Sequence, residues 1–478
     1  MRKYTCYYQY IKNNRLRKAK IKHRSEKNLS TIFNKEERLM KKRQIISLAL
    51  AGAMSLGLLA GCGSADDTTT ASGTTETQKE NAASEDAAAS TNEDAVATLI
   101  ANTTGTVDLT VWASEEDQEF TTGLLNSFKE KYKDVDFNIT LGAESESKAK
   151  DDILVDVESA PDVYTFADDQ INELVAAGAL QEVVTSYTYD VANENVAGSI
   201  EAASVNGKLY AYPMTADNGY FMFYDKSVFT EDDIQSLDKM IEAAKKANKK
   251  IAMTVSDGWY IYSFFKGAGY DLTLNEDGTN TCNWNAAGAT DVSQAILDLF
   301  KTGVFVDMTD ENQATAITEG SICACVNGTW RAETAKDAWG ENYAATKLPT
   351  FTVAGEQKQM SSFSGYKLIG VNPHSKNVGW AMILAEYLTN YDSQVARYEA
   401  RGLGPSNIEA SNSDAVQADP AIAALAAQAA YATPQRVGNN YWDPAKTLGQ
   451  ILATGNPDGT DLQEMLDTTV QGINAPVE

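Results

Sequence analysis

Acidic and aromatic side chains stand where predicted strands of this 478-residue chain end. In a parallel sheet, ligands bind outside the carboxyl ends of the strands. A carboxylate in such a loop accepts hydrogen bonds, so we expect these loops to bind a ligand. The side chains concerned are Glu115, Glu116 and Asp117 after the first strand, Phe166, Asp168 and Asp169 after the third, and Asp217 between two later strands.

These positions also have purely structural interpretations. Residues 115–117 fit a charge cluster at a helix N-terminus, where acidic side chains are favoured. Phe166 fits a core residue, Asp168 a cap or solvated side chain, and Asp217 a turn residue within one domain. Trp330 follows Asn-Gly-Thr at the end of a predicted strand at residues 322–327, which favours a ligand-facing position.

The residue types argue against nucleophilic catalysis and against a histidine-rich metal site. His374 is the only histidine after residue 61, and no nucleophile motif accompanies it. Cys282, Cys323 and Cys325 are too few for a disulfide framework. Cys323 and Cys325 share one predicted strand and should face the same way, as apolar packing. No phosphate-binding glycine loop, serine elbow or zinc signature occurs, so the sequence predicts no enzyme, metal or cofactor.

Strands and helices alternate after residue 106, which predicts the α/β class. Strands at 107–112 and 134–141, a third ending at Phe166, and helices between them indicate a parallel, doubly wound sheet. The segment 106–478 exceeds one common core, so we expect two lobes. Asn206-Gly207 predicts a two-residue hairpin, and Pro213 suits a point where the chain crosses between lobes.

The N-terminal segments indicate export and lipidation. Residues 1–39 are basic without an apolar period, and we interpret them as lying upstream of the true start at Met40. Residues 40–61 combine lysines, an apolar run and small residues, as a signal peptide does. Leu59-Ala60-Gly61-Cys62 resembles the bacterial lipobox, which predicts lipidation of Cys62. Residues 62–105 lack aromatic side chains, which predicts a disordered tether with a mean reach of about 35 Å.

The charge of the chain limits its partners. Residues 1–61 hold 15 Lys+Arg and 3 Asp+Glu, so the remaining chain has 25 basic and 63 acidic residues and a net charge of −38. Such a charge disfavours nucleic acid and anionic surfaces. It fits an extracellular protein with an uncharged or cationic ligand.

An ordered set of short motifs resembles the maltodextrin-binding proteins of carbohydrate ABC importers, within the extracellular solute-binding family. The set covers residues 106–478. The motifs are Leu109-Thr110-Val111-Trp112, Ala160-Pro161-Asp162-Val163, Asn206-Gly207-Lys208-Leu209-Tyr210-Ala211-Tyr212-Pro213, Tyr224-Asp225-Lys226, Val326-Asn327-Gly328-Thr329-Trp330, Leu348-Pro349-Thr350-Phe351 and Tyr441-Trp442.

The resemblance implies a two-lobed, periplasmic-binding-protein-like fold. Each lobe would hold a mainly parallel sheet flanked by helices, and a multi-strand hinge would let the lobes close over sugar. We expect lobe 1 at about 106–213 and 365–410, and lobe 2 at about 217–362 and 415–478.

The resemblance also implies acidic and basic sugar contacts. Glu116 or Asp117 matches the family's acidic loop, and Asp169 matches a sugar-binding carboxylate. Asp217 stands where the family usually has Glu, just past the hinge. Lys446 stands where the family can carry Arg.

Aromatic contacts are implied in the same way. Phe166 takes the place of a ring, usually Trp, that lies against a glucose. Trp259 and Tyr260 match an aromatic pair. Trp330 and Trp442 match two stacking tryptophans of the second lobe, and Tyr441 belongs to the same Tyr-Trp motif.

Together these features predict a monomeric lipoprotein on the outer face of the membrane of a Gram-positive-type bacterium. It would bind malto-oligosaccharides and deliver them to ABC permease subunits. Two alternatives stay open: a binding protein for another oligosaccharide or a cationic solute, and a glycoside hydrolase, because aromatic rings and paired carboxylates also suit that chemistry.

Overall fold

The computed structural model describes residues 94–275 and 277–476. The predictions for residues 1–39, for the signal peptide at 40–61 and for Cys62 lie outside the described residues. Within the described ranges, none of the helices combines the length and the apolar character needed to cross a membrane.

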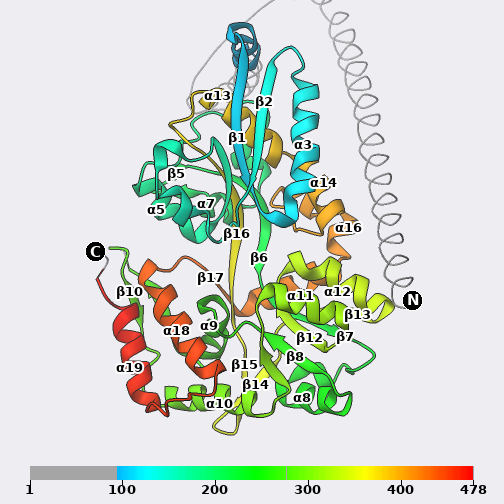
Figure 1. Ribbon diagram of the computed structural model, residues 1–478, viewed down its shortest axis with the longest axis vertical. Helices are drawn as coiled ribbons and strands as arrows, with labels where there is room; N and C mark the ends of the chain where they lie inside the picture. The colour runs from blue at the N-terminus through cyan, green and yellow to red at the C-terminus, as the bar shows by residue number, and fades with distance from the viewer. Residues whose placement is uncertain (1–93, 276, 477–478) are drawn as a thin grey trace, which may run out of the picture. The chain divides into compact units, whose positions relative to one another are not determined.

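A six-stranded mixed sheet forms the centre of what we call lobe 1 (Figure 1). Its first three strands run parallel, and the strand that enters late in the sequence runs antiparallel to β3. The order is β17 (Ala432–Pro434), β16 (Ser362–Val371), β3 (Val163–Ala167), β1 (Thr106–Ala113) and β2 (Asp136–Ala143), with β6 (Tyr212–Gly219) paired to β16.

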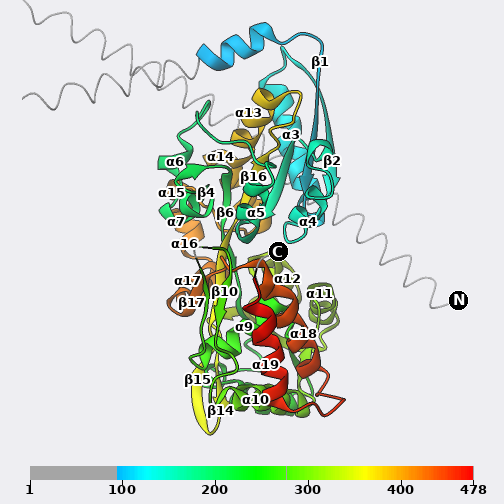
Figure 2. The same ribbon diagram turned by 90° about the vertical axis from the view of Figure 1, so that its left-hand side faces the viewer.

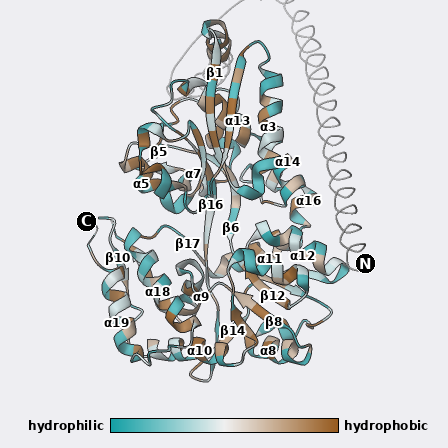
Figure 3. Ribbon diagram, viewed as in Figure 1, coloured by the Kyte–Doolittle hydropathy of each residue, from teal (hydrophilic) through white to brown (hydrophobic). Residues whose placement is uncertain are grey.

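Hydrophobic packing covers both faces of this sheet. One cluster joins β1 to helices α3 (Gln118–Lys131) and α13 (Val378–Thr389), and another surrounds β3 and α5 (Ile171–Ala176). Figure 3 shows hydrophobic residues along β1 and α13. All five residues of β3 are therefore buried, as expected for a strand covered on both faces.

A five-stranded mixed sheet forms the centre of lobe 2. Strands β8 and β11 run parallel to β12, whereas β7 and β13 include antiparallel pairs. The order is β11 (Phe305–Asp307), β8 (Lys250–Met253), β12 (Ile322–Asn327), β7 (Phe221–Asp225) and β13 (Tyr343–Thr346).

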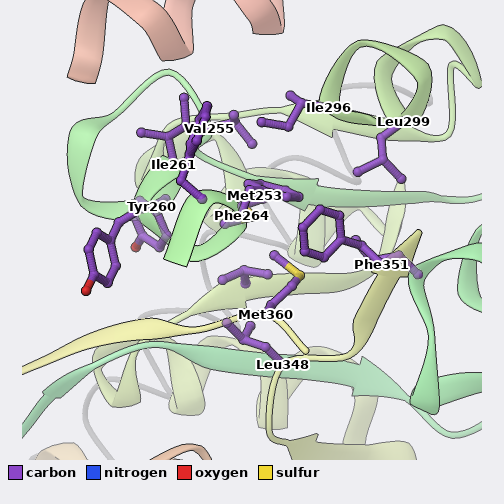
Figure 4. Packing of buried hydrophobic residues seen from close by; sticks show 14 of the residues in the cluster. Met253, Val255, Tyr260, Ile261, Phe264, Ile296, Leu299, Leu348, Phe351 and Met360 are labelled. Atoms are coloured by element: carbon purple, nitrogen blue, oxygen red, sulfur yellow. The ribbon is translucent and has the colours of Figure 1, made fainter. Parts of the chain in front are cut away.

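The core of lobe 2 joins that sheet to surrounding helices. Figure 4 shows Met253, Phe264, Phe351 and Met360 packed together in it. The helices that contribute side chains include α8 (Leu237–Lys246), α9 (Gly258–Gly267), α10 (Ala289–Lys301), α18 (Trp442–Ala453) and α19 (Leu462–Ile473). The α/β class is thus confirmed, and each sheet combines parallel with antiparallel pairs.

Strands β6 and β16 lie side by side and lead between the two sheets (Figures 1 and 2). Only Tyr220 separates the end of β6 from the start of β7 in lobe 2. The pairing of β6 with β16 contains register shifts, which interrupt the ladder where the chain changes lobe. Pro213, predicted at the crossing point, takes part in this pairing. It lies within β6 opposite Leu368, which an edge strand permits.

Two local predictions have different outcomes. The Asn206-Gly207 hairpin is confirmed, because β4 (Ser204–Val205) pairs antiparallel with β5 (Lys208–Leu209) and both turn residues have positive φ. The tether prediction is wrong at its C-terminal end. Residues 94–102 form a helix whose apolar side chains Val96, Leu99 and Ile100 pack against the lobe 1 core.

The three later cysteines are buried free thiols. Cys323 and Cys325 do not face the same way as predicted. Cys323 packs in the main lobe 2 cluster and Cys325 in a separate one. An irregularity in the register of β12 between residues 322 and 324 disrupts the alternation that the prediction assumed.

Candidate functional site

Asp217 lies inside β6, not in a loop between strands as predicted. Its carboxylate is only 2% exposed and connects three distant parts of the chain. Oδ2 accepts hydrogen bonds from the Thr329 hydroxyl at 2.5 Å and from the Gly404 backbone N–H at 2.6 Å. A Cβ at Gly404 would lie 2.9 Å from Asp217 Cβ, so glycine permits this approach. Asp217 therefore joins the crossing strand to the lobe 2 segment that carries Trp330.

Trp330 follows β12 in a short 3-10 helix, η6 (Thr329–Arg331). Its ring folds over Gly328, where any Cβ would overlap the indole. Arg331 pairs with Asp310 and is buried, which fixes the turn. The Trp330 ring itself stays partly exposed, as a ligand-stacking ring requires.

Trp259 lies at the start of α9, beside Trp330. Asp257 caps the helix by accepting a hydrogen bond from the Trp259 backbone N–H at 2.8 Å. The two tryptophan ring centroids are 6.0 Å apart and the rings are inclined by 33°. Tyr220 packs edge-on against Trp259 at 4.6 Å. Trp259 is partly exposed, so two neighbouring indoles with accessible surface form the aromatic part of the site.

The other predicted aromatic residues differ in exposure to solvent. Trp442 is partly exposed at the start of α18. Tyr441 is fully buried and donates a hydrogen bond to the Gly258 carbonyl at 2.6 Å. Tyr260 is 7% exposed and belongs to the lobe 2 core. Tyr441 therefore holds the first turn of α9, and Tyr260 anchors the same turn in the core, so neither presents a ring face for stacking.

The prediction that Phe166 lies against a sugar ring is contradicted by its burial. Its side chain has no exposed surface and packs with Tyr164 and Leu368 in the lobe 1 core. The cause is that β3 is a central strand with both faces covered, so its residues reach solvent only beyond its end at Ala167. Asp169 lies beyond that end and is half-buried.

The acidic side chains in the loop after β1 also differ in exposure to solvent. Glu116 is exposed in a 3-10 helix, η2 (Glu115–Asp117), whereas Asp117 is 4% exposed and pairs with Arg401 at 2.8 Å. The alternative of a helix N-terminal charge cluster matches the position of all three acids just before α3. Lys446 is exposed on α18.

Two charged residues that contact each other, Lys367 and Glu146, were not predicted as part of the site. Lys367, on β16, places its ammonium 5.3 Å from the Trp330 ring centroid and 3.6 Å from the Glu146 carboxylate. The net effect of its surroundings raises the pKa of Lys367, because Glu146, Asp117 and Asp217 outweigh its burial. A lone lysine in the otherwise apolar stretch 363–371 was the available signal.

The sequence also did not predict a role for the amide of Gln435, and the interpretation of Asp168 as a solvated side chain is wrong. Asp168 is 2% exposed, not solvated, and accepts hydrogen bonds from the Tyr366 backbone N–H at 2.9 Å and from Gln435 at 2.5 Å. Burial raises the pKa of Asp168 to about 6. Burial and the Asp168 charge together raise the pKa of Asp169 well above its usual value.

The assembled site thus combines partly exposed indoles from lobe 2 with carboxylates from lobe 1 and β6. In the described part of the chain, no three His, Cys, Asp or Glu side chains gather as metal ligands. Rings and hydrogen-bond acceptors of this kind suit a ligand with apolar faces and hydroxyl edges.

Comparison with known proteins identifies the family of this chain. The family described as bacterial extracellular solute-binding proteins matches residues 123–424. This chain belongs to that family. As a solute-binding protein it spans nearly the full length of its relatives. The galactooligosaccharide-binding protein of Bacillus subtilis (strain 168) is 28% identical over 390 residues, covering 76% of this chain and 89% of the relative.

A further relative and a solved structure also carry the name of an oligosaccharide ligand. The maltooligosaccharide ABC transporter solute-binding lipoprotein of Streptococcus pneumoniae serotype 4 (strain ATCC BAA-334 / TIGR4) is 23% identical, covering 73% of this chain and 85% of the relative. A solved structure with acarbose is 31% identical, with a TM-score of 0.70, and covers 77% of this chain and 99% of the other.

The maltodextrin-binding protein MalE1 from L. casei BL23, without ligand, is 25% identical with a TM-score of 0.65. The match covers 78% of this chain and 100% of the MalE1 chain. These likenesses confirm the two-lobed α/β fold of the solute-binding protein.

Proposed function

We propose that this solute-binding protein captures malto-oligosaccharides outside the cell by closing its two lobes, and delivers them to the permease subunits of an ABC importer. The proposal is supported by relatives named for maltooligosaccharide and maltodextrin binding. In this proposal the lobes are about 106–213 with 365–410, and about 217–362 with 415–478. Strands β6 and β16 of the six-stranded sheet extend across these bounds, and β17 of the same sheet lies in the second range.

One observation carries the proposal: Trp259 and Trp330 form a pair of partly exposed indoles beside acidic residues of the other lobe. A glucose ring has two faces lined with C–H groups and an edge of hydroxyls. Flat indoles cover the faces and exclude water, while carboxylates accept the hydroxyl hydrogens. In this proposal Trp259, Trp330 and Trp442 supply rings, and Asp169 accepts hydroxyl hydrogens.

Binding by both lobes follows from the energetics of sugar hydration. A hydrogen bond to a charged acceptor contributes ~1.5–3 kcal/mol, but the sugar must first shed water. Several such bonds must form together for tight binding, so the ligand favours the conformation in which both lobes contact it. Glu116 and Lys446 are exposed and would be available to longer oligosaccharides.

Lipidation of Cys62 would hold the protein at the membrane. A Cys62→Ala variant is expected in the culture medium, because an unlipidated chain has no anchor. Persistence of this variant in washed membranes would contradict the proposed anchor.

A galacto-oligosaccharide is the second candidate, favoured by the 28% identity to the Bacillus subtilis galactooligosaccharide-binding protein. Both sugars are uncharged rings with apolar faces, so the indoles suit either. Their glucose and galactose rings differ in the orientation of one ring substituent, which the hydrogen-bonding groups around the ring can distinguish.

The deciding experiment is titration calorimetry of the purified protein with α-linked gluco-oligosaccharides, galacto-oligosaccharides and spermidine. We expect maltotriose to bind most tightly. Tighter galacto-oligosaccharide binding would transfer the assignment to the second candidate, and tight spermidine binding with no sugar heat would overturn both. Maltoheptaose should be recovered intact, because shorter products would indicate a hydrolase.

A further inference from the structure

The Gln435 side chain contacts all three parts of the site at once. The residue follows β17, is 2% exposed, and its backbone N–H donates to the Ser364 carbonyl of β16 at 2.9 Å. Its Nε2 donates to Asp168 Oδ1 at 2.5 Å in lobe 1. Its Oε1 accepts from the Trp259 indole Nε1 at 3.0 Å in lobe 2, and from Asn218 Nδ2 of β6 at 3.3 Å.

The chemistry of the partners permits one orientation of this amide. An indole N–H can only donate, so the amide oxygen must face Trp259. The amide NH₂ then faces Asp168, whose carboxylate can accept. Rotating the amide by 180° would place its NH₂ group against the Trp259 N–H, donor against donor. It would also place the amide oxygen against the Asp168 carboxylate, acceptor against acceptor. The direction of the hydrogen bonds from Trp259 through Gln435 to Asp168 is therefore fixed.

The backbone of β16 leaves room for this contact. A Cβ at Gly365 would overlap Asp168 Oδ1 and lie 2.5 Å from Gln435 Cδ and Nε2. Gly365 has no positive φ that would otherwise require glycine. The missing side chain is thus needed for the approach of Asp168 and Gln435, and an alanine there would separate them.

We propose that Gln435 is a positioning residue for sugar binding, which holds the Trp259 indole in its stacking orientation by joining it to Asp168 across the two lobes. This inference rests on the proposed function of the site. The indole plane is set before the ligand arrives, so binding avoids the cost of ordering that ring. Gln435 need not touch the sugar to affect its affinity.

Several charged groups surround this chain of hydrogen bonds. Asp168 faces Asp169 on its own 3-10 helix, Arg436 next to Gln435, and the Tyr366 backbone N–H on β16. Lys150 and Glu173 act on Asp169 with opposite signs. Burial raises the pKa of Asp168 to about 6, so it is a carboxylate at pH 8.

The test exploits the difference between an amide and a carboxyl group at position 435. In Gln435→Glu at pH 8, two carboxylates would face each other, so the donor to Asp168 would be lost and the repulsion would displace side chain 435 from Trp259. At pH 5 a shared proton restores a donor toward Asp168 and an acceptor toward Trp259. We expect maltotriose affinity about ten-fold below wild type at pH 8, recovering to within about two-fold at pH 5.

Gln428→Glu is the matched control, because Gln428 is also buried and its amide contacts the backbone of Leu348 and Met360. It should alter stability without a pH-dependent change in affinity relative to wild type. A Gln435→Glu defect that does not change between pH 8 and pH 5 would overturn the proposal.

A double-mutant cycle separates positioning from simple space filling. Trp259→Phe keeps a ring but removes the indole N–H, so Gln435→Ala should weaken maltotriose binding about ten-fold in wild type and less than two-fold in the Trp259→Phe background. Additive losses would show that Gln435 does not act through Trp259 and would contradict the inference.

A measurement without sugar keeps this test distinct from that of the proposed function. The near-ultraviolet circular dichroism attributable to Trp259, taken as each protein minus its Trp259→Phe counterpart, should change between pH 8 and pH 5 in Gln435→Glu but not in Gln428→Glu. If this holds while no sugar binds, the proposed ligand is wrong and the positioning contact stands. An unchanged difference spectrum would refute the positioning contact itself.

Discussion

The carboxylates in and next to the six-stranded sheet differ from the tryptophans of lobe 2 in burial and in hydrogen bonding. Asp117, Asp168 and Asp217 are 4%, 2% and 2% exposed, and each already has a partner. Trp259 and Trp330 remain partly exposed. The indoles can cover a sugar face while keeping their present contacts. Asp117 and Asp168 would have to exchange a partner first, whereas Asp217 Oδ1 is buried without a hydrogen-bond partner.

This difference separates residues that build the site from residues that contact ligand. Removing a filled buried acceptor leaves its donors unsatisfied and lowers stability. Removing a partly exposed ring lowers binding while the fold loses little. The predictions below test that separation in order of decreasing effect.

The largest effect is expected for Asp217→Ala. The change leaves the Thr329 hydroxyl and the Gly404 N–H without their charged acceptor, so the free energy of unfolding should fall by about 3 kcal/mol in urea denaturation. Asp298→Ala, at an exposed site on α10, is the control and should cost under about 0.5 kcal/mol. Unchanged stability with lost maltotriose binding would make Asp217 a direct sugar ligand.

Trp330→Ala should act on binding instead. Loss of an interface tryptophan typically costs at least ~2 kcal/mol, so maltotriose affinity should fall about 30-fold or more in calorimetry. Tyr431→Ala removes an exposed aromatic ring elsewhere and should leave affinity unchanged. Equal losses for the two variants would argue against stacking at Trp330.

A carboxylate outside the site provides a test of pH dependence. Glu386 is fully buried and accepts hydrogen bonds from the Tyr187 and Thr188 backbone N–H groups and the Thr188 hydroxyl, while burial raises its pKa to about 6. Between about pH 4.5 and 6 the folded state holds more protons than the unfolded state. The contribution of Glu386 to stability should therefore fall by about 2 kcal/mol as pH rises through this range.

Glu386→Gln cannot titrate, so the fall in stability between pH 4.5 and 7 should be seen in wild type and be smaller by this amount in the variant when both are denatured at the two pH values. Sugar affinity should not follow this titration, since Glu386 does not border the indoles. Identical pH slopes for the two proteins would show that Glu386 titrates with an ordinary pKa.

The smallest effect is expected for Tyr441→Phe. The change removes the buried hydrogen bond to the Gly258 carbonyl and should lower the free energy of unfolding by about 1 kcal/mol. Maltotriose affinity should change less than two-fold, because the ring stays in the core. A larger loss of affinity than for Trp442→Ala would place Tyr441 among the ligand contacts.

Local sequence patterns predicted the elements that these variants occupy. The apolar run at 322–327 became β12 with the predicted bounds, and Asn206-Gly207 formed its hairpin, because both depend on near neighbours. The helix at 94–102 was missed although Val96, Leu99 and Ile100 show helical spacing. Its polar surroundings resembled a tether, and only contact with the lobe 1 core shows its role.

Which side chains reach the site was harder to predict. Phe166 and Tyr441 were placed there by resemblance and motif, yet both are buried, because exposure depends on what covers a strand or helix. Gln435 and Lys367 gave weak local signals. Their importance comes from partners more than 150 residues away, at Trp259 and Glu146.

The sequence by itself determined the α/β class and the two lobes, and it indicated an accessible position for Trp330 after a strand end, since periodicity and turn chemistry are local. The tertiary structure decided which carboxylates are filled, which rings are covered, and that one buried amide joins Trp259 to Asp168. Those properties require segments far apart in the chain to approach within hydrogen-bond distance, and local pattern carries no information about such distances.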